Sequence, residues 1–378
     1  MPKAYVLGIS MTKFGRHPDT SIQEMGSMAV WDAVTDAGIS IEEIGAVYCG
    51  HVFQGTGAGQ KIMTAVGLTG LPIINLENAC ASGATAFREA YHSVLAGRYD
   101  VCLAVGVEKL SGIYRGGLAD VKDLEGAQGL TFAALYALRA RRYMHTHGLK
   151  PETLAKIAVK NRKNAYYNEK ASYGELIDVD TVLNSRLVAD PLHFYECTPP
   201  SDGAAAAIIV SEEYARKSSG KPVEIAASAL TSGKLQFGFI DMTFEDITHR
   251  AAQDAYSQSG LGPEDVDFAE VHDCFTIAEI LRVESLGFCP PGGMAAWIEE
   301  GVTEINGKKP VNPSGGLLGK GHPLGATGIA QIYEICKQLR GQAGARQITG
   351  ARAGLAMCRG GATTGIEGNA CAIHILKL

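Results

Sequence analysis

The amino-acid sequence predicts an α/β protein built from two similar halves, with helices covering a mainly parallel sheet. The first observation is that residues 29–53 resemble residues 251–275 at a constant offset of 222 positions. The second is that residues 83–97 resemble residues 325–341, in the same order along the chain. One such match can arise by chance in a glycine-rich chain, but two in the same order indicate a strand–helix unit that is built twice.

The first repeated segment predicts a helix, a glycine stop and a strand in each half. An amphipathic pattern ends at Gly38 in the first copy and at Gly260 in the second, and an apolar stretch follows each glycine. A glycine directly after a helical pattern is a common signal for the end of a helix. The second repeated segment predicts a helix that begins after a loop, and we expect further strands at 101–107 and 369–376.

The two halves are expected to be unequal, because one segment has no counterpart. Residues 111–200 carry charged helical material and several turn signals that the second half lacks. We predict that they form an inserted loop domain, or lid, over a shared cleft. The predicted organisation is an N-terminal half of residues 1–110 and 201–222, interrupted by this insertion, and a C-terminal half of residues 223–378.

Composition excludes several classes of function. Of the 378 residues, 46% are apolar and 20% are charged, as in ordinary globular proteins. The formal net charge is −6 and no basic block is present, so nucleic acid is not an expected partner. No apolar run approaches the roughly 18 residues that a membrane helix needs. The nine cysteines occur singly, which favours reduced thiols in the cytoplasm over disulfides or a zinc site.

Cys80 is the first candidate for chemistry. It lies in the sequence ENACASG, at a predicted strand-to-helix junction. The positive end of a helix dipole and its free N–H groups favour a thiolate, and the small neighbours leave room for a substrate carbonyl. The alternative is a buried cysteine that packs as a small apolar residue.

His322 is the second candidate. It lies in the glycine-rich sequence NPSGGLLGKGHPLGATG, at the start of the helix that corresponds to the one after Cys80. If the halves pack with two-fold symmetry, the two helix starts meet, and the imidazole can accept the proton of the Cys80 thiol. The alternative is a histidine that only caps its helix.

Two further loops carry cysteines. His272 and Cys274 lie in VHDCF after an apolar strand, and Cys358 lies in MCRGG, expected in the loop before the last strand. Either cysteine is a candidate acid/base for the α-carbon of a substrate or for a departing thiol. The N–H groups beside Gly360 and Gly361 are candidates for an oxyanion hole. A lone cysteine at a strand end is, however, often inert.

These four loops, in this order, resemble the loops of the thiolase superfamily. ENACASG resembles the nucleophile motif, the loop around His322 resembles the GHP motif, and CRGG resembles the C-terminal cysteine–glycine loop. HDCF resembles the form found in sterol-carrier-protein thiolases and archaeal acetoacetyl-CoA thiolases. The resemblance covers nearly the whole chain. It implies a five-layered αβαβα fold made from two βαβαβαββ-type halves.

The resemblance also implies roles. Cys80 would form an acyl-enzyme, His322 would activate it, and the N–H groups of Cys80 and Gly360 would form an oxyanion hole. His272 would hold the second carbonyl together with His322, and Ser228 would contact the pantetheine arm. Coenzyme A would act as a substrate carrier, without a tightly bound cofactor or a metal.

The chain departs from the family pattern because it offers both Cys274 and Cys358 as the second cysteine. We favour Cys274, since CRGG continues into an unusual ATTGIEGNA. The expected reaction is reversible thiolytic cleavage or Claisen condensation of a 3-oxoacyl-CoA, either acetoacetyl-CoA or a bulkier aromatic, branched or steroid ester. The expected assembly is a homodimer or a dimer of dimers.

Two other functions stay open. One is a retro-aldol lyase, which some relatives in sterol side-chain breakdown are. The other is a thiolase-like subunit that pairs with a small zinc-bearing OB-fold protein. Retention of Cys80 and His322 argues against the first and against a purely structural role.

Overall fold

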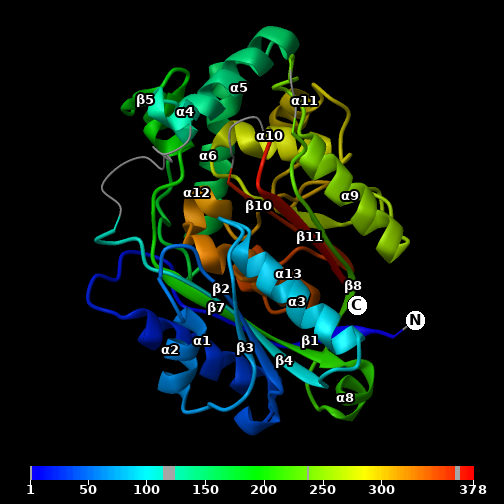
Figure 1. The fold of residues 1–378 in the computed structure, drawn as a ribbon. Helices are drawn as coiled ribbons and strands as arrows, with labels where there is room; N and C mark the ends of the chain where they lie inside the picture. The colour runs from blue at the N-terminus through cyan, green and yellow to red at the C-terminus, as the bar shows by residue number, and fades with distance from the viewer. Residues whose placement is uncertain (1, 114–123, 236–237, 362–366) are drawn as a thin grey trace.

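The computed structural model describes residues 2–113, 124–235, 238–361 and 367–378, and its central feature is a nine-stranded sheet (Figure 1). In chain order the strands of this sheet are β1 Ala4–Met11, β2 Ala46–Gly50, β3 Ile73–Leu76, β4 Val101–Glu108, β7 Gly203–Ser211, β8 Val223–Thr231, β9 Phe268–Glu270, β10 Ala353–Gly360 and β11 Ala370–Lys377. In space their order is β3-β2-β4-β7-β1-β8-β11-β10-β9.

This order is symmetric about the contact between β1 and β8. On one side of the contact lie β7, β4 and β2, and on the other lie β11, β10 and β9. The first two pairings on each side are antiparallel and the third is parallel. Both halves therefore repeat one connectivity, which confirms the predicted duplication.

The expectation of a mainly parallel sheet is wrong. Only the pairings β2–β3, β2–β4 and β9–β10 are parallel. Parallel neighbours require a crossover connection, whereas antiparallel neighbours do not. The last two strands of each half pair antiparallel with each other, and this makes the sheet mixed.

Helices cover both halves of the sheet. They are α1 Ile22–Ala37, α2 Ala58–Val66, α3 Ser82–Leu95 and α8 Glu212–Lys217 in the first half, and α9 Asp246–Ser259, α10 Thr276–Ser285, α11 Met294–Glu299, α12 Gly316–Lys320 and α13 Leu324–Leu339 in the second. Within the described residues, none of the helices combines the length and the apolar character that a bilayer crossing requires.

The glycine stops of the repeat are confirmed. α1 ends at Gly38 with φ 66°, and α9 ends at Gly260 with φ 69°. Both angles lie in the left-handed region, which favours glycine because it has no Cβ. The offset of 222 also aligns the start of β2 at Ala46 with the start of β9 at Phe268.

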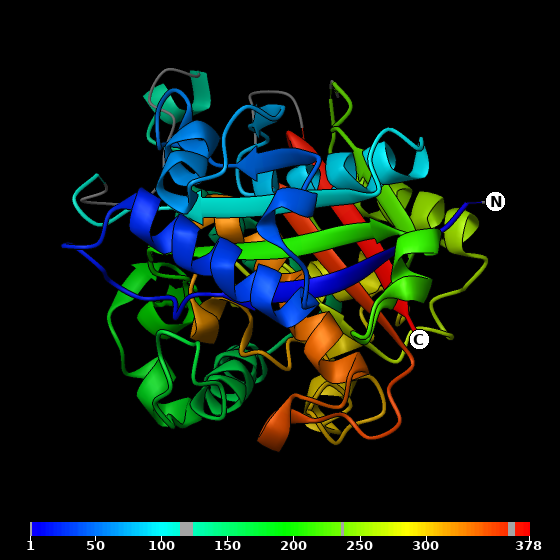
Figure 2. The ribbon, with the colours of Figure 1, turned by 90° about the horizontal axis from the view of Figure 1, so that it is seen from below.

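Alternate residues of β7 show how the layers are built. Ala205 and Ala207 face a core shared with α3 and α13, whereas Ala204 and Ala206 face a core shared with α1 and α2. A third core joins the other half of the sheet to α9 and α10. α3 and α13 thus lie between two sheet layers that carry helices outside, and Figure 2 shows α1 across the strands of the first half. The predicted five-layered αβαβα fold is confirmed.

The long connection between β4 and β7 contains the predicted insertion. Its elements are α4 Leu124–Ala127, α5 Phe132–His147, α6 Pro151–Tyr166, α7 Val179–Leu183, β5 Leu187–Ala189 and β6 Leu192–His193. α5 and α6 pack against α10, and α6 also packs against α12. Residues 114–123 of the insertion lie outside the described residues. The domain boundaries at 110, 200 and 222 stay a prediction.

The sequence analysis did not predict β10, Ala353–Gly360. The strand that follows α13 is β10, and residues 370–377 form the next strand, β11. Cys358 and Gly360 therefore belong to β10 and not to a loop. All eight residues of β10 are buried, with β11 paired along the whole strand and β9 along part of it, so its sequence lacks the alternation that marks a half-exposed strand.

We predict that Gly83→Ala destabilises the fold by about 1–3 kcal/mol, because α3 and α13 touch through their backbones. A Cβ at Gly83 would lie 2.3 Å from the carbonyl oxygen of Gly325. Urea denaturation checks this, with Gly15→Ala as the matched control, since a Cβ at Gly15 meets its nearest atom at 3.5 Å. Equal stability of the two variants would contradict the prediction.

Candidate active site

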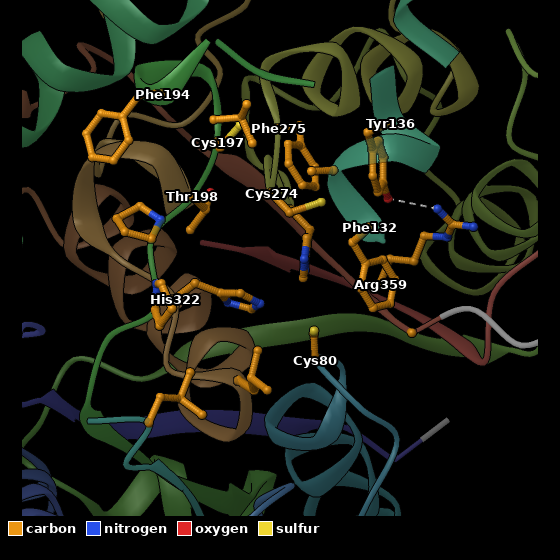
Figure 3. A pocket seen from close by; sticks show the side chains of 18 of the residues that line it. Cys80, Phe132, Tyr136, Phe194, Cys197, Thr198, Cys274, Phe275, His322 and Arg359 are labelled. Atoms are coloured by element: carbon orange, nitrogen blue, oxygen red, sulfur yellow. Dashed lines mark hydrogen bonds between the residues drawn. The ribbon is translucent and has the colours of Figure 1, made fainter. Parts of the chain in front are cut away.

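The loops singled out from the sequence line one cavity of about 300 Å³ (Figure 3). Cys80 comes from the turn before α3, His272 and Cys274 from the loop between β9 and α10, and His322 from the loop before α13. Aromatic side chains from the insertion and from the start of α10 add to the wall: Phe132, Tyr136, Phe194 and Phe275.

A strained turn presents Cys80. Ala79 has a φ of 49°, in the left-handed region that non-glycine residues seldom adopt. Ser82 holds the turn, because its hydroxyl accepts from the N–H of Asn78 at 2.9 Å and donates to the carbonyl of Ala79 at 2.6 Å. α3 begins at Ser82, two residues after Cys80. Backbone strain that neighbouring bonds maintain is frequent at functional sites.

The Cys80 thiol is not a thiolate in this state. Burial raises the pKa of Cys80 to about 12, although the N–H of Gly361 donates to its sulfur and opposes the shift. The expectation that the helix start favours a thiolate is therefore wrong, since desolvation outweighs the local N–H groups. Cys80 needs a base to remove its proton before it can act as a nucleophile.

His322 is held in the tautomer that a base requires. The Thr327 hydroxyl donates its one hydrogen to the carbonyl of Pro323 at 2.9 Å, so it must accept from His322 Nδ1–H at 2.7 Å. Nε2 of His322 is then unprotonated, and it has no partner among the described residues. Burial, followed by the charges of Arg282 and Lys320, lowers the pKa of His322 to about 3, so the ring is neutral near pH 7.

His272 lies beside His322. Their ring centroids are 4.8 Å apart and the rings are nearly perpendicular, at 80°. Nδ1 of His272 is 3.5 Å from the sulfur of Cys358, whose thiol donates to the carbonyl of Cys80 at 3.1 Å. Because the Cys358 thiol already donates its hydrogen, its sulfur can only accept from His272, so Nδ1 of His272 carries the hydrogen and Nε2 does not. Burial and His322 lower the pKa of His272 well below its usual value.

The packing of the halves brings the predicted residues together. The sulfur of Cys80 and one ring nitrogen each of His272 and His322 lie within 4.8 Å of one another. A thiol and two imidazoles are also a ligand set that zinc accepts. The absence of a metal therefore stays a prediction.

Asp273 ties the HDCF loop to the loop before α13. Its carboxylate is fully buried and accepts from the N–H of Leu317 at 2.6 Å and from the Asn161 side chain at 2.8 Å. Gly316 is required here, because a Cβ would lie 2.2 Å from Asp273 Oδ2. The carboxylate thus positions His272 and His322 relative to each other.

The two candidate second cysteines differ in access. Cys274 is partly exposed and lines the cavity, and Nη1 of Arg282 lies 3.6 Å from its sulfur. Cys358 is 1% exposed, is absent from the cavity wall, and has its thiol hydrogen bonded to the Cys80 carbonyl. Burial raises the pKa of Cys358 well above its usual value. The geometry therefore favours Cys274.

The glycine beside Cys80 is Gly361 and not Gly360. Gly361 lines the cavity, and its N–H points at the Cys80 sulfur. Gly360 ends β10 and packs on the turn, where a Cβ would lie 2.0 Å from the carbonyl oxygen of Asn78. Gly360 thus permits close packing, and of the two candidate glycines Gly361 is the one beside Cys80.

Ser228 is not placed to contact a substrate. It lies within β8, is fully buried, and bonds to Nδ1 of His374 on the neighbouring strand at 2.9 Å. The expectation of a pantetheine contact at Ser228 is therefore wrong. The sequence alone did not reveal that β8 extends to Thr231, which keeps Ser228 inside the sheet.

Comparison with protein-family models decides the family. "Thiolase, N-terminal domain" matches residues 4–213, and "Thiolase C-terminal domain-like" matches residues 236–370. The chain belongs to the thiolase family. It is similar over 98% of its length to an acetyl-CoA acetyltransferase of Methanothermobacter thermautotrophicus, with 42% identity and 98% of that protein covered.

Other thiolase relatives extend the comparison. The benzoylsuccinyl-CoA thiolase subunit BbsB of Thauera aromatica is 39% identical over 92% of this chain and 91% of its own. Among solved structures, the Ltp2-ChsH2(DUF35) aldolase is similar with a TM-score of 0.86 and 27% identity, covering 98% of this chain and 97% of that one. Human mitochondrial 3-ketoacyl-CoA thiolase shares the fold, with a TM-score of 0.75 over 100% of this chain and 98% of that one, at 17% identity. The protein is thus an acyltransferase of the thiolase type.

Several residues of this thiolase site were not found from the sequence. Thr327 sets the tautomer of His322, and Tyr136, Arg282 and Arg359 line the cavity. Arg282 is a charged residue of α10, a helix whose residues are all buried, and it could have been singled out on that ground. A charged residue inside such a helix usually has a specific role or partner. Tyr136 and Arg359 lie on separate elements, so only the fold shows that they meet.

We predict that Thr327→Val lowers thiolase turnover about 10- to 100-fold. The change leaves the buried His322 Nδ1–H without its acceptor, at a cost of about 1–3 kcal/mol. Thr327→Ser, which keeps the hydroxyl, should restore most of the activity. Steady-state kinetics with a pH profile checks this, and an unchanged profile in the valine variant would contradict the role of Thr327.

Proposed function

We propose that this thiolase cleaves or forms 3-oxoacyl-CoA thioesters through a covalent acyl group on Cys80. The observation that carries the proposal is the convergence of the Cys80 sulfur with one ring nitrogen each of His322 and His272 in a largely apolar cavity. A thiol with a raised pKa and a neutral base within reach are what a two-step acyl transfer needs.

The first step acylates Cys80. His322 Nε2 takes the thiol proton, and the sulfur attacks the 3-oxo carbon of the substrate. The N–H groups of Cys80 and Gly361 hold the oxygen of the tetrahedral intermediate, since donors that face developing charge in a desolvated site lower the barrier. The bond between the α- and β-carbons then breaks, and the electron pair goes to the α-carbon as the enolate of the second thioester.

The second step involves Cys274 and the imidazoles. Cys274 gives its proton to the α-carbon, which releases acetyl-CoA, and His322, which carries the Cys80 proton on Nε2, donates to the carbonyl oxygen of the enolate beside His272. Free coenzyme A then enters, the Cys274 thiolate takes its thiol proton, and its sulfur attacks the acyl group on Cys80, which releases the shortened acyl-CoA. The Cys80 sulfur leaves and takes back its proton from His322, so that the site returns to its starting state. The reverse sequence is the Claisen condensation. Coenzyme A acts throughout as a substrate.

The acyl substrate is proposed to be acetoacetyl-CoA or a bulkier 3-oxoacyl-CoA. A cavity of about 300 Å³ with a wall of aromatic side chains accepts more than an acetyl group. The insertion supplies much of this wall, including Phe132 and Phe194.

An alternative is a thiolase-like subunit that acts as a retro-aldol lyase with a zinc-bearing OB-fold partner. The similarity to the Ltp2-ChsH2(DUF35) aldolase favours it. The presence of Cys80 with an unprotonated His322 Nε2 favours acyl transfer instead. Such a partner is nevertheless compatible with acyl transfer. We further propose a cytoplasmic homodimer or dimer of dimers, supported by nine free cysteines and by the open edge of β3.

We predict that incubation with an acyl-CoA adds one acyl group to the protein, on Cys80. Mass spectrometry of the intact chain and of its peptides checks this, with Cys80→Ser as the control that removes the thiol. The adduct should disappear when coenzyme A is added. Retro-aldol activity of the Cys80→Ser variant, with no adduct on the native chain, would support the lyase instead.

We also predict that Cys274→Ala lowers thiolysis at least about 100-fold, whereas Cys358→Ala lowers it less than about 10-fold, because only Cys274 reaches the cavity. Acylation of Cys80 should survive in the Cys274→Ala variant, since the first thiol and base are intact. Thiolysis rates for the two variants decide the assignment. Equal losses would remove the preference for Cys274.

A further inference from the structure

Beside Cys274 the cavity wall contains charge that the proposed reaction does not use. Arg282 and Arg359 line the cavity, although they are only 1% and 5% exposed. Both contact the hydroxyl of Tyr136, Arg282 at 2.6 Å and Arg359 at 3.1 Å. Arg139, Arg282 and Arg359 all pair with Glu245, and these four residues are called the arginine cluster below.

The positive charge of the arginine cluster is not balanced by the residues that the structure describes. Burial alone would raise the pKa of Glu245, but the surrounding guanidinium groups lower it to about 2, so it is a carboxylate. Burial raises the pKa of Tyr136 to about 12, so the phenol is neutral near pH 7. Glu367 is the next carboxyl group, and burial raises its pKa. Even with Glu367 ionised, three guanidinium groups face two carboxylates.

Arg282 also keeps unused hydrogen-bond donors. Of its five N–H groups, one bonds to Tyr136 and one to the sulfur of Cys274. Its Nε has no hydrogen-bond partner among the described residues, although Glu245 lies 3.4 Å away. Burial of a guanidinium with unpaired N–H donors and uncompensated charge costs free energy unless an anion binds to it.

We propose that the arginine cluster binds a carboxylate on the acyl part of the substrate, so that this thiolase prefers dicarboxylic acyl-CoA thioesters of the succinyl or glutaryl type. This inference rests on the proposed function and names its substrate class. Arg282 touches Cys274, so the carboxylate would lie a few bonds from the reacting carbons. The aromatic wall receives the apolar remainder of the acyl chain.

The phosphates of coenzyme A are a second possible source of negative charge. They are separated from the thioester by the whole pantetheine arm, whereas Arg282 lies next to Cys274 at the reacting end of the cavity. A guanidinium pairs with a carboxylate through parallel hydrogen bonds, which suits a group at a defined distance from the thioester. The substrate carboxylate is therefore the favoured occupant.

The test compares succinyl-CoA with butyryl-CoA, which carries a methyl group in place of the carboxylate. The rate of Cys80 acylation is measured by mass spectrometry. In the native enzyme succinyl-CoA should react at least about 10-fold faster. Arg282→Met should lower the ratio of the succinyl rate to the butyryl rate about 10- to 100-fold. Succinyl-pantetheine should show the same loss, because it keeps the carboxylate and lacks the nucleotide phosphates.

Controls separate a specific role from a structural one. Arg282→Lys keeps the charge and should retain part of the preference, whereas Arg216→Met removes an exposed arginine of α8 and should change neither rate. If Arg282→Met does not fold, the native preference for succinyl-CoA over butyryl-CoA still decides the proposal.

Four outcomes would overturn the inference. Equal native rates for the two thioesters would refute it while leaving acyl transfer intact. An equal loss of both rates in Arg282→Met would make Arg282 a general electrostatic residue. A loss confined to coenzyme A esters, absent with succinyl-pantetheine, would assign the arginine cluster to the phosphates. Absence of any Cys80 adduct with either ester would refute the proposed function as well.

Discussion

The backbone contact between α3 and α13 determines where the chemistry can take place. A Cβ at Gly83 would lie 2.3 Å from the Gly325 carbonyl oxygen, and one at Gly328 would lie 2.4 Å from the Ala84 nitrogen. Only glycine allows two helices to approach this closely. Because Cys80 precedes α3 by two residues and His322 precedes α13 by two, the contact also brings nucleophile and base together. The symmetric packing of the two halves therefore places the nucleophile and the base next to each other.

Burial sets the protonation states at that meeting point. Desolvation keeps the Cys80 thiol protonated and keeps both His272 and His322 neutral. The site therefore holds a thiol beside a base whose tautomer is imposed by Thr327, and not a preformed ion pair. Proton transfer from Cys80 to His322 separates charge, and it occurs when the substrate supplies a carbonyl whose oxygen can accept the negative charge. A rigid set of neutral groups costs less to bury than separated charges.

α10 links the chemistry to the choice of substrate. The loop before it carries His272 and Cys274, and its own buried face carries Arg282. α5 from the insertion packs on α10 and contributes Tyr136, which meets Arg282 and Arg359 at its hydroxyl. Variation in the insertion can therefore reshape the acyl cavity while the loops from the duplicated halves stay in place. A reaction centre on the duplicated halves beside a cavity wall supplied by an insertion is typical of folds whose specificity lies in loops.

The sequence by itself determined the duplicated architecture, the ends of α1 and α9, and the loops that hold Cys80, His272, Cys274 and His322, because periodicity, glycine stops and local motifs are short-range properties of the chain. Several features depended on tertiary structure. Ser228 turned out to be interior, the choice between Gly360 and Gly361 beside Cys80 was decided by the fold, and β10 was hidden by burial on both faces. The pKa of Cys80 and the arginine cluster were likewise invisible, since desolvation and charge pairing arise between segments that are far apart in sequence and meet only in the folded chain.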